Sequence, residues 1–135
     1  MMNACAVREW SWPLPFRATS VRHGRSQVAA VLGSFDVQSA IIDDACAVVS
    51  ELLGNAVRHA RPLSDGRVLL TMTVDESSVS IAVVDGGGPT VPSLVRPKPM
   101  SLAGRGLEIV HTLTSSWGVR KAAEGNTVYA VLQPT

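Results

Sequence analysis

Residues 51–60 read Glu51-Leu52-Leu53-Gly54-Asn55-Ala56-Val57-Arg58-His59-Ala60 and carry the strongest structural signal in the chain. At 3.6 residues per helical turn, Glu51, Asn55 and Arg58 fall on one stripe of a helix, with His59 at the edge of that stripe. A carboxylate, an amide and a cation are an unusual set among so many aliphatic neighbours. The segment therefore predicts a helix that presents one chemically active stripe.

Two glycine clusters follow this helix. Asp85-Gly86-Gly87-Gly88-Pro89 ends an apolar run, and Gly104-Arg105-Gly106-Leu107 stands at the start of a later helix. Backbone N–H groups at a helix start carry the positive end of the helix dipole, and glycines admit a phosphate chain without a Cβ clash. The order of carboxylate, glycine turn and helix start suggests a nucleotide site. Glycine-led helices are also common without a ligand, so the second cluster alone leaves both interpretations open.

The composition predicts one globular domain covering residues 1–135. Hydrophobic residues make up 46% and charged residues 17% of the 135, and the formal net charge is +1. A balance so close to neutral gives no electrostatic reason to expect nucleic acid as a partner. Cys5 and Cys46 are too few and too far apart for a disulfide framework or a zinc site. No stretch resembles a membrane span or a signal peptide, so we expect a cytoplasmic location and no membrane partner.

The pattern of apolar residues predicts the elements. Helical spacing covers residues 20–35, with Gly24 as an interruption, and residues 38–60, where Ile41, Ala45, Val48, Leu52 and Ala56 form the core stripe. Residues 68–74 and 79–84 alternate as a strand hairpin. Residues 7–16 are an edge strand at best, because prolines cannot donate to a ladder.

The second half of the chain predicts a lid, a helix and another hairpin. Residues 86–103 are rich in glycine and proline, and a stretch this long without regular structure is usually functional. A third helix follows, with Leu107, Val110, Leu113 and Trp117 on one stripe, and residues 119–123 and 127–132 close the chain as strands. Clustered helices and hairpin-connected strands predict an α+β two-layer sandwich, a mixed or antiparallel sheet with helices on one face.

The residues themselves suggest roles in a nucleotide site. Asp85 could accept a hydrogen bond from the exocyclic amine of adenine, with Gly87 allowing close approach of the base, or it could merely cap the glycine turn. Asn55 could supply an oxygen to Mg²⁺, which takes its other ligands from phosphates and water. Glu51 could act as a base toward a hydroxyl, although a lone glutamate on a helix is usually a solvated residue.

The three segments together resemble a known family. Glu51-x-x-x-Asn55-Ala56-x-x-His59-Ala60 resembles the N-box, Asp85-Gly86-Gly87-Gly88 the G1 box and Gly104-Arg105-Gly106-Leu107 the G2 box of the GHKL superfamily, which shares the Bergerat ATP-binding fold. Within that superfamily the chain looks like the anti-sigma factor serine-protein kinases. Glutamate at position 51 and the sequence Asn-Ala-Val-Arg-His-Ala favour this branch over histidine kinases. The resemblance covers about residues 16 to 133.

This resemblance implies a set of site residues. Asn55 would bind Mg²⁺, Glu51 would be the catalytic base, and Asp85 would hold adenine with help from Thr127 through water. Gly87 and Gly88 would lie at the base, Gly104, Arg105, Gly106 and Leu107 at the phosphates under the lid, and Arg58 and His59 beside the phosphates. The family's first glycine box usually reads Asp-x-Gly-x-Gly, whereas Pro89 stands here at the fifth position. Proline removes one backbone donor and fixes the entry to the lid, which puts lid closure and turnover in doubt.

The resemblance implies an ATP-dependent serine/threonine kinase that binds ATP, ADP and Mg²⁺. Its expected partners are a sigma factor and a small antagonist protein, and a homodimer is left open. The alternative is a nucleotide-binding regulatory module with little or no kinase activity that works by protein contact. A histidine kinase is disfavoured because no phosphoacceptor helix precedes the domain. An ATPase subunit of a larger machine is disfavoured because no transducer domain is present.

Overall fold

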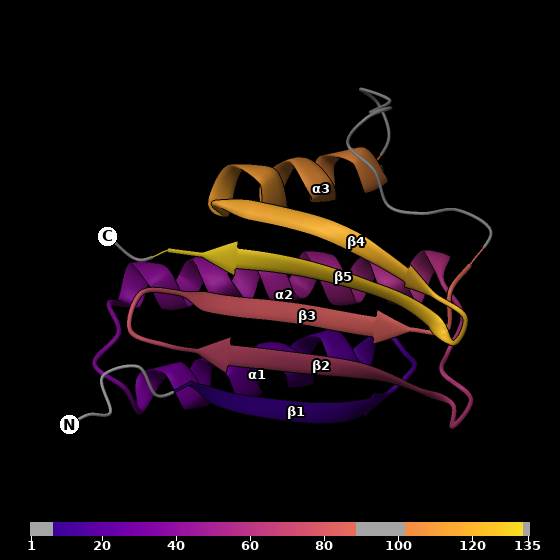
Figure 1. The fold of residues 1–135 in the computed structure, drawn as a ribbon, viewed down its shortest axis with the longest axis horizontal. Coiled ribbons are helices and arrows are strands. Elements are labelled where there is room, and N and C mark those ends of the chain that lie inside the picture. Colours follow the sequence, from indigo (N-terminus) through magenta and orange to yellow (C-terminus); the bar gives the residue numbers. More distant parts are fainter. Residues whose placement is uncertain (1–6, 89–101, 134–135) are drawn as a thin grey trace.

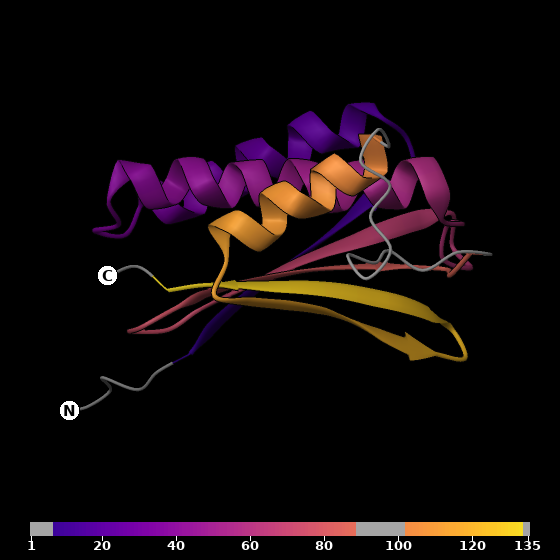
Figure 2. The same cartoon turned by 90° about the horizontal axis from the view of Figure 1, so that it is seen from above.

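The computed structural model describes residues 7–88 and 102–133, which form two layers (Figures 1 and 2). The elements are β1 (Arg8–Pro15), α1 (Thr19–Gly33), α2 (Ser39–His59), β2 (Arg67–Val74), β3 (Val79–Asp85), α3 (Leu102–Leu113), β4 (Ser116–Ala122) and β5 (Gly125–Leu132). Figure 2 shows the helices on one face of the sheet. The predicted α+β two-layer fold is confirmed.

The sheet has five strands in the order β1-β2-β3-β5-β4. Every neighbouring pair is antiparallel, which selects the antiparallel form of the expected sheet over the mixed one. β1 is an edge strand, as its prolines predict, since Pro13 and Pro15 remove donors from the ladder. β3 is the central strand, and its pairing with β5 joins the β2–β3 hairpin to the β4–β5 hairpin.

Alternation along the central strands sends every second side chain toward the helices. The buried apolar side chains are Val68, Leu70 and Met72 on β2, Val79, Ile81 and Val83 on β3, and Val128, Ala130 and Leu132 on β5. Successive side chains on a strand point to opposite faces, so the residues between them lie on the uncovered face of the sheet. The same parity also decides which polar side chains at the strand ends face the helices.

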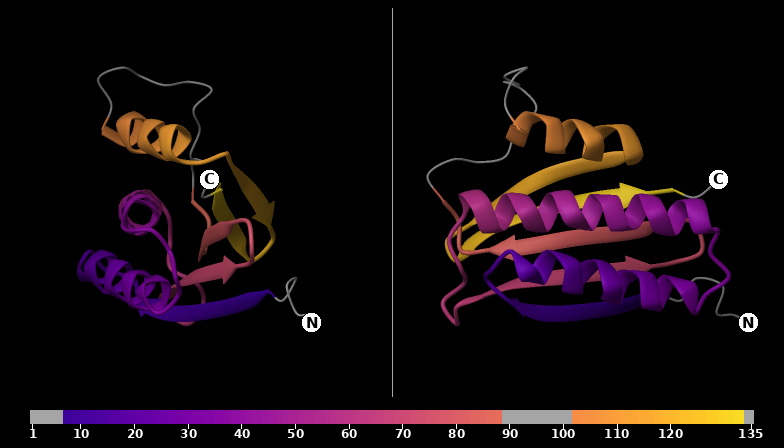
Figure 3. Two further views of the ribbon diagram at one scale, coloured as in Figure 1. Left: turned by 90° about the vertical axis from the view of Figure 1, so that its left-hand side faces the viewer. Right: turned by 180° about the vertical axis from the view of Figure 1, so that it is seen from behind.

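α2 is the central helix and supplies most of the helical part of the core. Figure 3 shows it between α1 and α3. Ala45, Val48, Leu52 and Ala56 of the predicted stripe are buried, and Ile41 at its N-terminal end is half-buried. Burying a leucine or valine stabilises the fold by about 1.5–3 kcal/mol per side chain. The predicted spacing of apolar residues is therefore the physical reason that α2 lies across the sheet.

Two local predictions were wrong. Gly24 does not interrupt α1, because the helix runs through it and buries it against α2. Trp117 does not continue the third helix, since α3 ends at Leu113 and Trp117 pairs with Ala130 in the sheet. The Thr114 N–H donates to the Val110 carbonyl at 3.1 Å, and the next backbone N–H, that of Ser115, donates to the Val131 carbonyl of β5 at 2.8 Å. The backbone thus changes from helical to sheet bonding within one residue.

The predicted lid is described only at its two ends. Gly86, Gly87 and Gly88 follow β3, and residues 102–103 belong to α3, while Pro89 and the rest of residues 89–101 lie outside the described residues. Across residues 7–88 and 102–133, none of the helices is long and apolar enough to cross a membrane.

Candidate functional site

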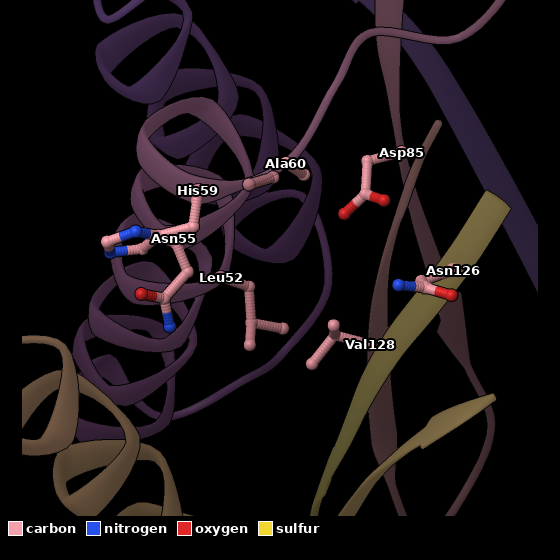
Figure 4. A pocket seen from close by; sticks show the side chains of 8 residues that line it. Leu52, Asn55, His59, Ala60, Asp85, Asn126 and Val128 are labelled. Atoms are coloured by element: carbon pink, nitrogen blue, oxygen red, sulfur yellow. The ribbon is translucent and has the colours of Figure 1, made fainter. Parts of the chain in front are cut away.

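A pocket opens at the end of the molecule where four elements meet. α2 and β3 end there, and β5 and α3 begin there (Figure 1). This small hollow is lined by Leu52, Asn55, Ala56, His59, Ala60, Asp85, Asn126 and Val128. Figure 4 shows the α2 side chains on one side of this pocket and those of β3 and β5 on the other.

Asn55 brings an unsatisfied polar group to the pocket. Its side chain is 5% exposed, and its Nδ2 has no hydrogen-bond partner among the described residues. A buried donor without a partner costs about 1–3 kcal/mol, so natural proteins rarely keep one without a reason. An amide presents one oxygen acceptor and two N–H donors, which suits it to hold a polar or charged ligand.

Asp85 is the second buried polar group, at the end of β3. It is 4% exposed, and one of its carboxylate oxygens accepts the backbone N–H of Gly87 at 2.7 Å. Burial raises the pKa of Asp85, and the backbone N–H groups of Gly87 and Asn126 oppose that rise. A further N–H donor from a ligand would stabilise the charged carboxylate in the same way.

The glycine turn after β3 is fixed against the end of α2. The Arg61 N–H donates to the Gly87 carbonyl, and the Gly86 N–H donates to the Arg61 carbonyl, both at 2.7 Å. A Cβ at Gly86 would collide with the Pro62 carbonyl, and one at Gly88 would lie 2.9 Å from the His59 carbonyl. Gly87 instead has a φ of +87°, a left-handed conformation that favours glycine. These glycines therefore serve the packing of the turn itself.

The stripe predicted on α2 divides into pocket and surface residues. Asn55 and His59 line the pocket. Glu51 lies one helical turn before Asn55 and is half-buried, outside the pocket lining. Arg58 is exposed and folds back over Gly54, whose Cβ position lies 3.2 Å from an Arg58 guanidinium nitrogen.

β5 contributes a residue that sequence reasoning missed. Thr127, the residue expected to assist adenine recognition, pairs with Val84, and alternation turns its side chain to the face away from the helices. Asn126 pairs with Asp85, is 7% exposed and lines the pocket. Counting back by twos from the apolar Val128 would have placed Asn126, and not Thr127, on the helix side of the sheet.

The second glycine cluster lies in the first turns of α3. Gly104, Arg105, Gly106 and Leu107 fall within Leu102–Leu113, and the start of α3 is at the pocket end of the molecule (Figure 1). The structure describes their backbone as helical, and their side chains lie outside what it describes. The positive end of this helix dipole thus lies at the same end as Asn55 and Asp85.

A preformed cluster for a metal held by the protein alone is absent from the part of the chain that the structure describes. No group of three or more His, Cys, Asp or Glu side chains comes together there. Cys46 is a free, half-buried thiol whose pKa is raised by burial.

The comparison with protein families identifies the kind of domain that contains this pocket. The histidine kinase-like ATPase domain family matches residues 14–132. The chain belongs to this family. No curated protein matches the chain significantly. As a histidine kinase-like ATPase domain, the chain has the fold of a nucleotide-binding domain, and the pocket between α2, β3 and β5 is its candidate nucleotide site.

Two solved structures resemble this ATPase domain. The crystal structure of the RsbU and RsbW domains of Rv1364c from Mycobacterium tuberculosis is 20% identical, with a TM-score of 0.71 over 93% of this chain and 32% of that chain. The histidine kinase domain of a blue-light activated histidine kinase from Erythrobacter litoralis is 18% identical, with a TM-score of 0.49 over 89% of this chain and 61% of that one. The chain thus spans about a third of the first matched structure. At this identity the first likeness shows the fold.

Proposed function

We propose that the chain is an ATP-dependent serine/threonine protein kinase that regulates transcription by partner switching. It would phosphorylate a small antagonist protein and bind a sigma factor. The observation that carries this proposal is the convergence of Asn55, Asp85 and Asn126, three buried polar side chains from three elements, on one pocket. Family membership makes a nucleotide the natural ligand of that pocket.

The described residues fit an adenine nucleotide with Mg²⁺. The unpartnered Nδ2 of Asn55 calls for an acceptor such as a phosphate or water oxygen, while its Oδ1 can face a cation. Mg²⁺ would neutralise charge on the phosphates when bound. Asp85 would accept the exocyclic amine of adenine, with the Asn126 amide beside it on the neighbouring strand.

The remaining roles follow from position. The start of α3, with Gly104, Arg105, Gly106 and Leu107, would face the phosphates through its backbone N–H groups. His59 lines the pocket and would flank the phosphates, whereas exposed Arg58 would meet them only from the rim. Glu51, one turn from Asn55, would accept the proton of the attacking hydroxyl. Residues 1–135 would act as one domain.

The choice of this regulatory branch rests on sequence resemblance. Glutamate at position 51 and the Asn55-to-Ala60 sequence are similar to the anti-sigma factor kinases. The matched crystal structure from Mycobacterium tuberculosis contains an RsbW domain, and that likeness supports the shared fold. Pro89 supports the alternative, a switch module with little kinase activity, because it replaces the last glycine of the first glycine box.

The variant Glu51→Gln tests whether the chain is a kinase or a switch module with little kinase activity. The isosteric amide should leave nucleotide affinity nearly unchanged, because adenine recognition lies on β3 and β5. Transfer of phosphate from labelled Mg-ATP to candidate antagonist proteins encoded nearby should fall roughly 10²–10⁴-fold, the usual contribution of a general base. If the parent transfers no phosphate but binds partners in a nucleotide-dependent way, the kinase proposal is wrong and the switch-module alternative is supported.

A further inference from the structure

Asn126 is a buried polar side chain to which the proposed function assigns no contact. It is the second residue of β5, it pairs with Asp85 across the sheet, and it is 7% exposed. An asparagine next to a glycine often serves only the turn, by hydrogen bonding to its own backbone. Within the described residues, however, none of the side-chain hydrogen bonds uses the Asn126 amide. Its side chain lines the pocket instead.

The backbone fixes Asn126 beside Asp85. Gly125 has a φ of +156°, and a Cβ there would collide with the Asp85 carbonyl and lie 3.1 Å from the Gly86 Cα. The start of β5 is therefore pressed against the end of β3, as only a glycine allows. Directly opposite residues of an antiparallel pair have Cβ atoms about 4.5–5.5 Å apart on the same face of the sheet. The carboxylate and the amide thus face the pocket side by side.

Asp85 also decides which atom of the Asn126 amide lies next to it. A charged carboxylate only accepts hydrogen bonds, whereas an amide has one acceptor oxygen and two N–H donors. The negative charge repels the amide oxygen and attracts the N–H groups, so Nδ2 is the atom beside the carboxylate. Figure 4 shows Nδ2 on the side of Asn126 that faces α2 across the pocket. This wall of the pocket therefore presents an acceptor next to a donor.

Adenine carries the complementary pair of groups. Its exocyclic amine is a donor, and the ring nitrogens on the two sides of that amine, N1 and N7, are acceptors. An asparagine amide is a well-established hydrogen-bond partner of this base for that reason. The carboxylate of Asp85 by itself recognises only the amine. A donor next to the carboxylate can bond the neighbouring ring nitrogen of the same base.

We propose that Asn126 is a specificity-determining residue of the nucleotide site, whose amide N–H donates to the ring nitrogen beside the exocyclic amine of adenine. Asp85 accepts that amine at the same time. Two adjacent contacts of opposite polarity hold the base in one orientation and reject a base that lacks either group. This inference rests on the nucleotide binding in the proposed function, and it does not depend on phosphate transfer.

The test replaces single atoms of the base and measures binding to the full chain by isothermal titration calorimetry. The ligands, all with Mg²⁺, are ADP, 1-deaza-ADP and 7-deaza-ADP, in which a C–H group replaces N1 or N7. The parent should bind one of the two deaza analogues about 3- to 10-fold more weakly than ADP, which is the contribution of one neutral hydrogen bond. The sensitive analogue identifies the nitrogen that Asn126 contacts.

Asn126→Ala removes the same contact from the protein. Its affinity for ADP should fall about 3- to 10-fold, and it should bind ADP and the sensitive analogue within about twofold of each other, because the two changes remove one interaction. Thr127→Val is the matched comparison. It removes a polar group from the next residue of β5, whose side chain lies on the other face of the sheet, so it should keep the parent's preference for ADP.

The outcomes separate this inference from the proposed function. A parent that binds ADP and both deaza analogues equally would overturn the amide contact and leave the nucleotide site intact, and this result needs no variant that might fail to fold. An Asn126→Ala variant that keeps the parent's preference, or a Thr127→Val variant that loses it, would also overturn the contact. A parent that binds none of the three nucleotides would overturn this inference together with the nucleotide site.

Discussion

Asp85 is a carboxylate that the fold removes from water, and its role should be visible in the pH dependence of stability. Burial raises its pKa, so its contribution to stability is fully present below the unfolded pKa of an aspartate and is lost as pH rises through the folded pKa. Asp85→Asn imitates the neutral acid. We expect the variant to gain stability relative to the parent as pH rises from about 4 to 7, while it loses ATP binding. Denaturant unfolding at several pH values measures this.

Asp75→Asn is the control, because its stability relative to the parent should change with pH in the opposite direction. In the turn after β2 its carboxylate accepts the N–H groups of Ser77 and Ser78, both at 2.8 Å, and these bonds lower its pKa. Its contribution is present above the unfolded pKa and disappears as pH falls through the folded pKa. Asp75→Asn should therefore lose stability relative to the parent as pH rises. If both variants shift in the same direction, burial is not what sets the pKa of Asp85.

If Asn55 binds the ligand, its side chain should contribute little to the stability of the ligand-free protein and much to the affinity for the ligand. Asn55→Ala removes an unpartnered buried Nδ2, so the ligand-free protein should lose less than the 2–5 kcal/mol that truncation of a large core side chain costs. The affinity for Mg-ATP should nevertheless fall about 10- to 100-fold, the value of one hydrogen bond to a charged group. Calorimetric titration with and without Mg²⁺ measures it. Parent-like binding would show that Asn55 does not face the phosphates.

At the scale of the elements, we expect substitution by alanine to have opposite effects on stability at two glycines within helices. Gly54→Ala meets only the movable end of Arg58, so it should stabilise the protein by about 0.5–1 kcal/mol through helix propensity. Gly24→Ala places a Cβ against Leu53, Leu70 and Val49 in the core, so it should destabilise by roughly 1–3 kcal/mol through overpacking. Thermal unfolding measures both. A stabilising Gly24→Ala would show that α1 and α2 are not in close contact.

The connections between elements explain why the pocket is a property of the assembled sheet. The Arg61 backbone joins the end of α2 to the glycine turn after β3. Pairing of Asp85 with Asn126 then joins that turn to β5. Asn55 thus comes to lie across the pocket from Asp85 only through contacts between residues that are far apart in the sequence.

At the scale of the whole molecule, nucleotide should stabilise the entire fold, because the pocket exists only when α2, β3 and β5 are assembled. A ligand at a hundredfold excess over its dissociation constant adds about 2.7 kcal/mol, which corresponds to a rise in Tm of roughly 10 °C for a domain of this size. ATP and ADP should produce this shift with Mg²⁺. GTP should not, because its exocyclic carbonyl would face the Asp85 carboxylate. An equal shift with GTP would contradict the assignment of adenine to Asp85.

Features that depend on local spacing could be predicted from the amino-acid sequence. Apolar residues three or four apart specify α2 and its buried stripe, alternation specifies β2 and β3, and prolines mark β1 as an edge strand. The grouping of Asn55 with Glu51 follows from helical periodicity alone. Asp85 could be singled out because a carboxylate ends a strand of apolar residues.

Features that depend on contacts between distant segments became visible only in the folded chain. Asn126 and not Thr127 lies in the pocket, because the parity of β5 is set by pairing with β3. α3 ends before Trp117, because sheet bonding to β5 competes with the helix there. Arg25 of α1 reaches Ser50 of α2, because Gly24 lets the two helices approach closely. Local patterns encode which face of an element is buried, whereas the partner of that face is fixed by packing across the whole chain.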